Sequence, residues 1–198
     1  MGLSYTFRKS ALDNLQRWDV TAQGLLCTDT KTEQQNLVHY SFIQSVRLQF
    51  QPYREFRHNN FRCRITTTNV GVIDILSTSY VDFAEFSDEA KTYTPFVKAL
   101  VKQVKSVNPN CVIYLGQAPA VFKGNLVLIL VVVAFAFWLI FAIPIGQNRV
   151  LALLLIIIGA LQYLKMSKNI NSPQQFNGEE IPDDVLPQTA VNTSTDIK

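Results

Sequence analysis

Residue types that carry catalysis or bind metals are scarce in this chain of 198 residues. It has two histidines, three cysteines and eight glycines. His39, His58, Cys27, Cys63 and Cys111 are too scattered for a zinc site, and the odd, unpaired cysteines are typical of reduced thiols in a cytosolic domain. The glycines form neither a P-loop nor a G-x-G-x-x-G turn, and no serine stands in a G-x-S-x-G elbow. We therefore expect no enzyme, no metal site and no cofactor.

Charge is also scarce, and its distribution is uneven. Charged residues make up 17% of the chain, against about 25% in an ordinary soluble domain. Residues 126–145 read LVLILVVVAFAFWLIFAIPI, and residues 150–164 read VLALLLIIIGALQYL. Neither run contains a charged side chain. A wholly soluble protein is excluded, and so is a chain that is disordered throughout.

The two apolar runs predict a transmembrane helical hairpin over residues 119–168, with helices at 126–145 and 150–165. The first run makes about 30 Å of helix, which matches the hydrocarbon core of a bilayer. The second makes only about 22 Å and spans if Arg149 and Lys165 extend to the interface. An interfacial or re-entrant helix is the alternative for this second run.

Positive charge predicts the orientation of the hairpin. Only Arg149 lies in the connection between the runs, whereas several lysines flank the pair: Lys102, Lys105, Lys123, Lys165 and Lys168. Since positively charged flanks stay in the cytoplasm, both termini are expected there. The first 18 residues lack a continuous apolar stretch and so do not resemble a secretory signal.

Short strands dominate the polar region before the hairpin. Trp18–Thr21 and Leu25–Thr28 flank a turn, and Leu37–Ile43 follows. Alternation of apolar with polar residues predicts strands around 46–51 and 61–66, and Asn69–Gly71 leads into Val72–Ser77. The result is six or seven antiparallel strands with local connections.

An amphipathic helix is predicted after these strands. Thr94 and Pro95 form a helix start, and Asn108 with Pro109 ends the helix. Its apolar side is expected to pack on the sheet, and its lysines to form a solvated side. Cys111–Leu115 suits one last short strand.

A group of arginines is the main charged feature of this region: Arg47, Arg54, Arg57, Arg62 and Arg64. In the expected register Arg47 and Gln49 share the outward side of one strand, and Arg62 and Arg64 that of its neighbour. Such a face suits lipid phosphates or another anion. The alternative is that Glu55 and Asp74 neutralise part of it. Nucleic acid is not expected as a partner, because the patch is small and tethered to a membrane.

Other polar groups are given structural roles. His39 is expected to be packed within a strand, and His58 to be solvated in a turn. The carboxylates at 82, 85, 88 and 89 are interpreted as a charged loop at the start of the helix rather than an acid–base pair.

The last segment, 169–198, has five acidic residues against one lysine, and its composition is typical of disorder. Within it, Ile181, Val185 and Leu186 are bracketed by prolines. We expect 181–187 to dock on the domain or on a partner, with the neighbouring acidic residues near Arg47, Arg62 and Arg64, and 190–198 to be disordered.

Several strands followed by one amphipathic helix resemble a pleckstrin-homology-like (PH-like) barrel, in which a helix plugs one open end. With two adjacent apolar helices and the sequence IPDDVLP at 181–187, the chain from about 5 to 187 is similar to small bacterial inner-membrane proteins. The resemblance implies an α+β fold, a small antiparallel β-barrel or sandwich with a C-terminal capping helix. It also implies the inner membrane, and it brings no functional residue.

These observations predict three parts: a cytosolic domain at 1–118, the hairpin at 119–168 and the acidic tail at 169–198. The predicted function is a membrane-anchored, non-catalytic binding or scaffold protein. Its partners would be the bilayer and a protein or anionic lipid. The alternative is an accessory subunit of a larger integral transport or respiratory complex.

Overall fold

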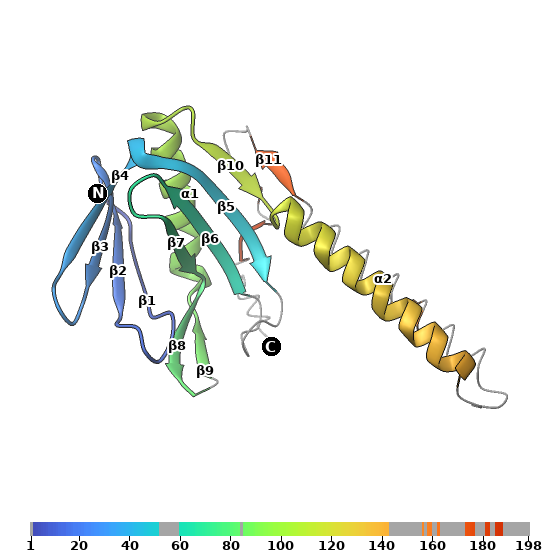
Figure 1. Ribbon diagram of the computed structural model, residues 1–198. Helices are drawn as coiled ribbons and strands as arrows, with labels where there is room; N and C mark the ends of the chain where they lie inside the picture. Colours follow the sequence, from blue (N-terminus) through green and yellow to red (C-terminus); the bar gives the residue numbers. More distant parts are fainter. Residues whose placement is uncertain are drawn as a thin grey trace, which may run out of the picture. The chain divides into compact units, whose positions relative to one another are not determined.

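The computed structural model describes residues 2–51, 60–83, 85–142, 156, 158, 159, 162, 173–176, 181–182 and 185–187. The chain divides into two compact units, residues 1–114 with 175–198, and residues 115–174. The first unit combines antiparallel sheets with one long helix (Figure 1). The predicted α+β class is confirmed. The predicted three-part division stays a prediction.

The first sheet is a meander of four strands, β1 (Ser4–Phe7), β2 (Gln16–Val20), β3 (Gly24–Asp29) and β4 (Gln35–His39). All neighbouring strands are antiparallel. The predicted hairpin around Ala22–Gly24 is confirmed, because Val20 pairs with Leu25. The sequence analysis missed β1, in which exposed Ser4 and Thr6 alternate with buried Tyr5 and Phe7.

The second sheet has the order β11-β10-β5-β6-β7. Its strands are β5 (Ile43–Gln51), β6 (Asn60–Thr67), β7 (Val72–Leu76), β10 (Val112–Leu115) and β11 (Gln174–Phe176). Its buried side carries Val46, Leu48, Cys63, Ile65 and Ile75. The predicted alternation at 46–51 and 61–66 thus places apolar residues on one side of the sheet.

The single strand predicted at Leu37–Ile43 is wrong. Strand β4 ends at His39, a 3-10 turn, η1 (Tyr40–Phe42), follows, and Ile43 begins the second sheet. Tyr40 is buried at this corner and donates a hydrogen bond to the Thr21 carbonyl oxygen at 2.8 Å. His39 is exposed rather than packed, because Val38 takes the inward position of this edge strand. His58 lies outside the described residues.

A third, two-stranded sheet consists of β8 (Thr78–Asp82) and β9 (Glu85–Asp88). The interpretation of this acidic segment as a loop is therefore wrong. The same strands contain Tyr80 and Phe86, which pair across the hairpin with their rings 5.6 Å apart. This aromatic cross-strand pair stabilises strands in which acidic residues are otherwise unfavourable.

Helix α1 (Ala90–Val107) begins five residues before Pro95, the predicted first helical residue. The Asp88 carboxylate accepts a hydrogen bond from the Ala90 N–H at 2.9 Å, so Thr94 is not the N-cap. Pro95 lies inside the helix. The buried side of α1 packs on the first sheet: the Tyr5 ring contacts the rings of Tyr93 and Phe96, at 5.6 and 5.4 Å.

The tail contributes to the first unit. After β11, which lies beside β10, Ile181, Leu186 and Pro187 are buried and Val185 is half-buried. The Thr94 hydroxyl donates a hydrogen bond to the Pro187 carbonyl oxygen at 3.0 Å. Thr94, read from the sequence as a cap, thus fixes the tail against α1.

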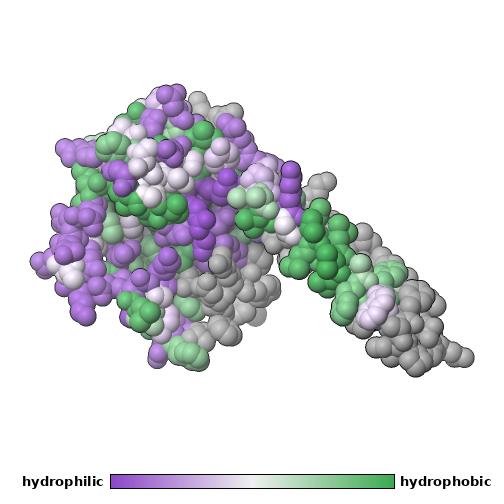
Figure 2. Space-filling model, in the orientation of Figure 1, coloured by the Kyte–Doolittle hydropathy of each residue, from purple (hydrophilic) through white to green (hydrophobic). Residues whose placement is uncertain are grey.

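The second unit contains helix α2 (Pro119–Ala142), which starts seven residues before the apolar run. Within the described residues it is the one helix long and apolar enough to cross a membrane, over Pro119–Trp138. Figure 2 shows apolar side chains along its surface. Of the second predicted helix only residues 156, 158, 159 and 162 are described, and all four are helical. The hairpin itself stays a prediction.

Candidate functional site

The outward side of the second sheet carries a row of aligned charged and aromatic residues. Arg47 of β5 lies opposite Arg64 of β6, and Arg64 lies opposite Asp74 of β7. Arg62 lies opposite Gln49, one step along the same side. The predicted register of these arginines is confirmed. We call Arg47, Arg62 and Arg64 the guanidinium row.

One carboxylate holds two members of the guanidinium row. Arg64 makes a two-point ion pair with Asp74, with Nε–Oδ1 2.8 Å and Nη2–Oδ2 3.0 Å. Arg62 Nη1 lies 3.8 Å from Asp74 Oδ2. Burial would raise the pKa of Asp74, but the hydrogen bonds from Arg64 and the charges of Arg62, Arg64 and Lys9 outweigh it, so its pKa is lowered. Asp74 is therefore a carboxylate that positions guanidinium groups.

Arg47 is held by an aromatic ring. Its guanidinium carbon lies 4.5 Å from the ring centroid of Tyr114 on β10, the neighbouring strand. Partial burial lowers the pKa of Arg47, the phenol of Tyr114 opposes this, and the charge of Arg64 adds to the lowering. An anion bound beside Arg47 would offset both the desolvation of its guanidinium group and the repulsion from Arg64, because a negative charge favours the protonated form.

The structure places only part of the predicted arginine site. Arg54, Arg57 and Glu55 lie outside the described residues. Gln49, expected to face outward, is buried, with an exposed fraction of 8%. The expectation that Asp74 neutralises part of the face agrees with its ion pairs. Among the residues that the structure describes, the row combines three guanidinium groups with one carboxylate, a composition that suits phosphate or carboxylate ligands.

Sequence reasoning missed Tyr114 and Lys9 as neighbours of this site. Tyr114 alternates with buried Ile113 and Leu115 in a strand that was predicted. Its position beside Arg47 depends on β10 pairing with β5, some 65 residues earlier in the chain. No local sequence pattern indicates that β10 pairs with β5, because the two strands are far apart in the chain.

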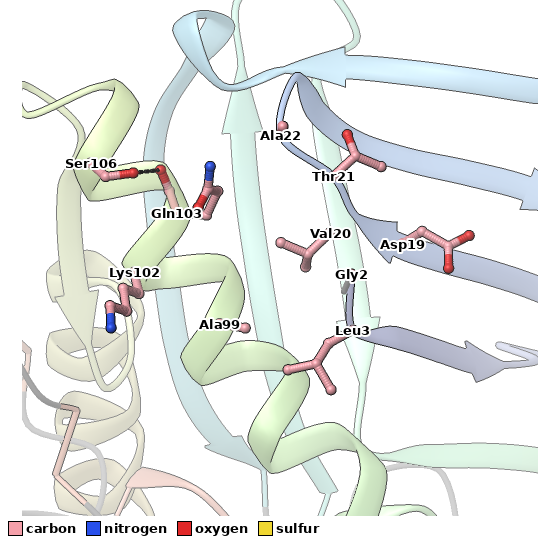
Figure 3. A pocket seen from close by; sticks show the side chains of 10 residues that line it. All are labelled: Gly2, Leu3, Asp19, Val20, Thr21, Ala22, Ala99, Lys102, Gln103 and Ser106. Carbon is pink, nitrogen blue, oxygen red and sulfur yellow. Dashed lines mark hydrogen bonds between the residues drawn. The ribbon is translucent and has the colours of Figure 1, made fainter.

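A second surface feature is a groove of about 570 Å³ between α1 and the first sheet. Figure 3 shows Leu3 and Val20 directed from the strands toward α1, with Ala99 opposite them. Ser106 donates a hydrogen bond to the Gln103 carbonyl oxygen at 2.8 Å along the helix wall. The groove lies within the first unit.

The predicted docking residues Ile181, Val185 and Leu186 are placed with the first unit, two of them buried. Burial of Ile181 and Leu186 removes apolar surface from water, worth about 1.5–3 kcal/mol for each full side chain. The acidic residues expected to meet the guanidinium row, at 179, 180, 183 and 184, lie outside the described residues.

The three cysteines are free. Cys63 is fully buried, and desolvation, followed by the charge of Asp74, raises the pKa of its thiol. Desolvation and Asp29 raise the pKa of half-buried Cys27 to about 11. High thiol pKa values indicate structural rather than reactive cysteines. Among the described residues, no three His, Cys, Asp or Glu side chains come together as a metal site.

The chain was compared with protein-family models, with curated proteins and with solved structures, and none of the three comparisons gave a match.

Proposed function

We propose that this chain is a membrane-anchored, non-catalytic binding protein that presents a PH-like domain beside an anionic membrane surface, where it holds a lipid or protein partner. One observation carries the proposal. The strands that enter and leave the apolar segment, β10 and β11, lie next to each other in one sheet. The folded domain is thus attached to that segment at both ends.

The composition and exposure of α2 support a membrane anchor. Its 24 residues rise about 36 Å, which exceeds the hydrocarbon thickness of about 30 Å. No charged residue follows Lys123 within the helix. Leu128, Val131 and Trp138 have exposed fractions of 61, 59 and 62%. Apolar surface of this extent needs lipid or another helix to cover it.

The strand pairing supports a return through the membrane. If α2 crosses the bilayer, residue 142 reaches the opposite side, about 30 Å from β10. The chain then comes back to place Gln174–Phe176 beside β10. An even number of crossings satisfies this constraint, and the apolar run at 150–164 supplies the second. Both termini then lie on one side, which the flanking lysines assign to the cytoplasm.

The order of elements supports the PH-like assignment. A four-stranded antiparallel meander is followed by three antiparallel strands, and then by a helix whose apolar side covers the first sheet. The β8–β9 hairpin is an insertion between the second sheet and that helix. The backbone of β1 continues toward β8, where the Tyr80 N–H donates to the Arg8 carbonyl oxygen at 2.8 Å.

The guanidinium row supports an anionic lipid headgroup as one ligand. Tyr114, which orients Arg47, precedes the first residue of α2 by five positions. A basic group this close in sequence to the anchor is within reach of the bilayer surface. Each Lys or Arg near an anionic leaflet contributes about 1 kcal/mol of attraction.

Native mass spectrometry of the full chain from mixed phosphatidylcholine and phosphatidylglycerol micelles tests this function. We expect retained phosphatidylglycerol to fall in Arg47→Gln. It should stay unchanged in Arg17→Gln, a control whose side chain is 55% exposed on the first sheet. Equal retention of phosphatidylglycerol in Arg47→Gln and Arg17→Gln would contradict a role of Arg47 in lipid binding. Stoichiometric recovery with one large integral complex would instead favour an accessory subunit.

A further inference from the structure

We propose that the groove between α1 and the first sheet, together with the lysines along its helix wall, binds an acidic peptide segment of a partner protein. This inference rests on the proposed binding function only in naming the class of partner. It concerns a surface separate from the guanidinium row, so the two can fail independently.

Helix α1 supplies the charge. It carries four lysines and no Asp or Glu: Lys91, Lys98, Lys102 and Lys105. At about 100° per residue these positions fall within an arc of about 60°, and they extend over about 21 Å of helix. Lys91, Lys98 and Lys102 are exposed. In the part of the chain that the structure describes, no carboxylate forms an ion pair with Lys91, Lys102 or Lys105.

The groove provides a concave binding site next to these lysines. Its volume of about 570 Å³ lies in the range of about 300–1,000 Å³ that is typical of ligand sites. Small residues line it from both sides, Gly2 and Ala22 on the sheet and Ala99 and Ser106 on the helix (Figure 3). Leu3, with an exposed fraction of 43%, offers an apolar contact. The small side chains on both walls allow the backbone of an extended segment to approach closely.

The opposite wall does not repel an acidic ligand. Its one carboxylate, Asp19, accepts a hydrogen bond from the Ser4 hydroxyl and forms an ion pair of 3.1 Å with Arg17. That carboxylate is 18% exposed. Asp19 is thus compensated on its own strand pair, whereas Lys102 brings a positive charge to the helix wall of the groove.

The concave shape favours a peptide over a bilayer. A flat membrane surface would contact the exposed lysines but would leave the space between Leu3 and Ala99 unfilled. The buried side of α1 packs on the first sheet. The guanidinium row lies on the second sheet, on the side opposite buried Val46, Cys63 and Ile65. The lysines therefore face away from the proposed lipid-binding side. A segment that alternates acidic with apolar residues satisfies both charge and groove.

The test measures binding of one defined probe to the full chain in phosphatidylcholine nanodiscs, which carry no net negative lipid charge. The probe is a fluorescein-labelled peptide with three repeats of Ser-Glu-Leu-Glu. Its binding is measured by fluorescence anisotropy. Two variants probe the site: Lys102→Glu reverses one charge on the wall, and Ala99→Trp fills the groove while keeping every lysine. Lys31→Glu is the matched control, since Lys31 is an exposed lysine of the β3–β4 turn. Circular dichroism establishes that each variant is folded.

We expect saturable binding that weakens at least about fivefold in Lys102→Glu and in Ala99→Trp, stays unchanged in Lys31→Glu, and declines with salt. No saturable binding, or equal weakening in Lys102→Glu and Lys31→Glu, would overturn the proposal. Binding that depends on Lys102 but is unchanged in Ala99→Trp would show an electrostatic surface and would also overturn it. Lipid retention by Arg47→Gln is measured separately. A failure of peptide binding would therefore not contradict the proposed membrane function.

Discussion

Asp74 is the residue on which the arrangement of the second sheet's charges depends. It is 13% exposed, and it neutralises part of the repulsion between Arg64 and Arg62. Without its carboxylate, Arg64 would lose its ion pair while it lies opposite Arg47 of the neighbouring strand, an arrangement of like charges that costs stability. On the other flank of β5, the ring of Tyr114 holds the guanidinium group of Arg47, whose carbon lies 4.5 Å from the ring centroid.

Replacing Asp74 by Asn should lower the thermal midpoint of the full chain by several degrees at pH 7, for a loss of about 2 kcal/mol. Since the pKa of Asp74 is lowered in the folded state, its contribution is present above its unfolded value of 3.8 and is lost as pH falls below that value. The difference between wild type and Asp74→Asn should therefore shrink between pH 5 and pH 3. A difference that is constant over this range would contradict the ion-pair account.

Asp29 should titrate far below an ordinary carboxyl group. The hydrogen bond from Asn14 at 2.8 Å, with those from the Thr32 and Lys31 N–H groups, lowers its pKa to about 2. Replacing Asn14 by Ala should raise this pKa, and NMR titration of the Asp29 carboxyl carbon measures it. An unchanged pKa of Asp29 in Asn14→Ala would contradict this account of the turn.

At the scale of elements, the β3–β4 hairpin contains a close backbone approach. A Cβ atom on Gly24 would lie 2.4 Å from the Val38 carbonyl oxygen. Gly24→Ala should destabilise the domain by about 1–3 kcal/mol, because backbone rather than a flexible side chain has to move. Gly124→Ala is the control, since no atom lies within 4 Å of the added carbon. Equal melting of the two variants would show that β4 is not held against Gly24.

The tail segment is a second element that can be tested alone. Leu186→Asp should speed hydrogen exchange at Val185 and at the first turns of α1, because the side chain is buried and Pro187 accepts from Thr94. Leu12→Asp makes the same change at a side chain that is 98% exposed and should leave exchange unaltered. Fast exchange at Val185 in the wild type would show that 181–187 is not docked.

Strands with a strong alternation of apolar and polar residues were predictable from the sequence. The positions at which strands and helices begin or end were not. The β2–β3 turn and the alternation in β5 and β6 follow from period-two burial. The break at Tyr40 depends on the hydrogen bond that its hydroxyl donates to the carbonyl oxygen of Thr21, in the turn between β2 and β3. The start of α1 depends on the hydrogen bond from the Ala90 N–H to the Asp88 carboxylate. Thr94 and Pro95 look like a helix start locally, but tertiary contacts assign Thr94 to the tail instead.

The candidate site was predictable to the same extent. The side shared by Arg47, Arg62 and Arg64 follows from alternation in two neighbouring strands. The partners that give this side its chemistry, Asp74 and Tyr114, come from strands added on either flank. Sequence identified Asp74 as a neutralising group, but the ring beside Arg47 required knowledge of which strand lies next to β5.

At the scale of the molecule, the two sides of one small domain carry the two proposed binding surfaces. The outward side of the second sheet has guanidinium groups near the strand that leads into α2. The exposed side of α1 has lysines and a groove.

The most direct test of the central claim is cysteine accessibility at two positions, in a Cys27→Ser background that keeps buried Cys63 and Cys111. Lys31→Cys reports on the domain, and Gln147→Cys on the connection between the apolar runs. With a membrane-impermeant maleimide, the account predicts that inverted vesicles label only Lys31→Cys and intact cells with a permeable outer envelope label only Gln147→Cys. Labelling of both positions from the same side would contradict a domain anchored at both ends by a membrane-crossing hairpin.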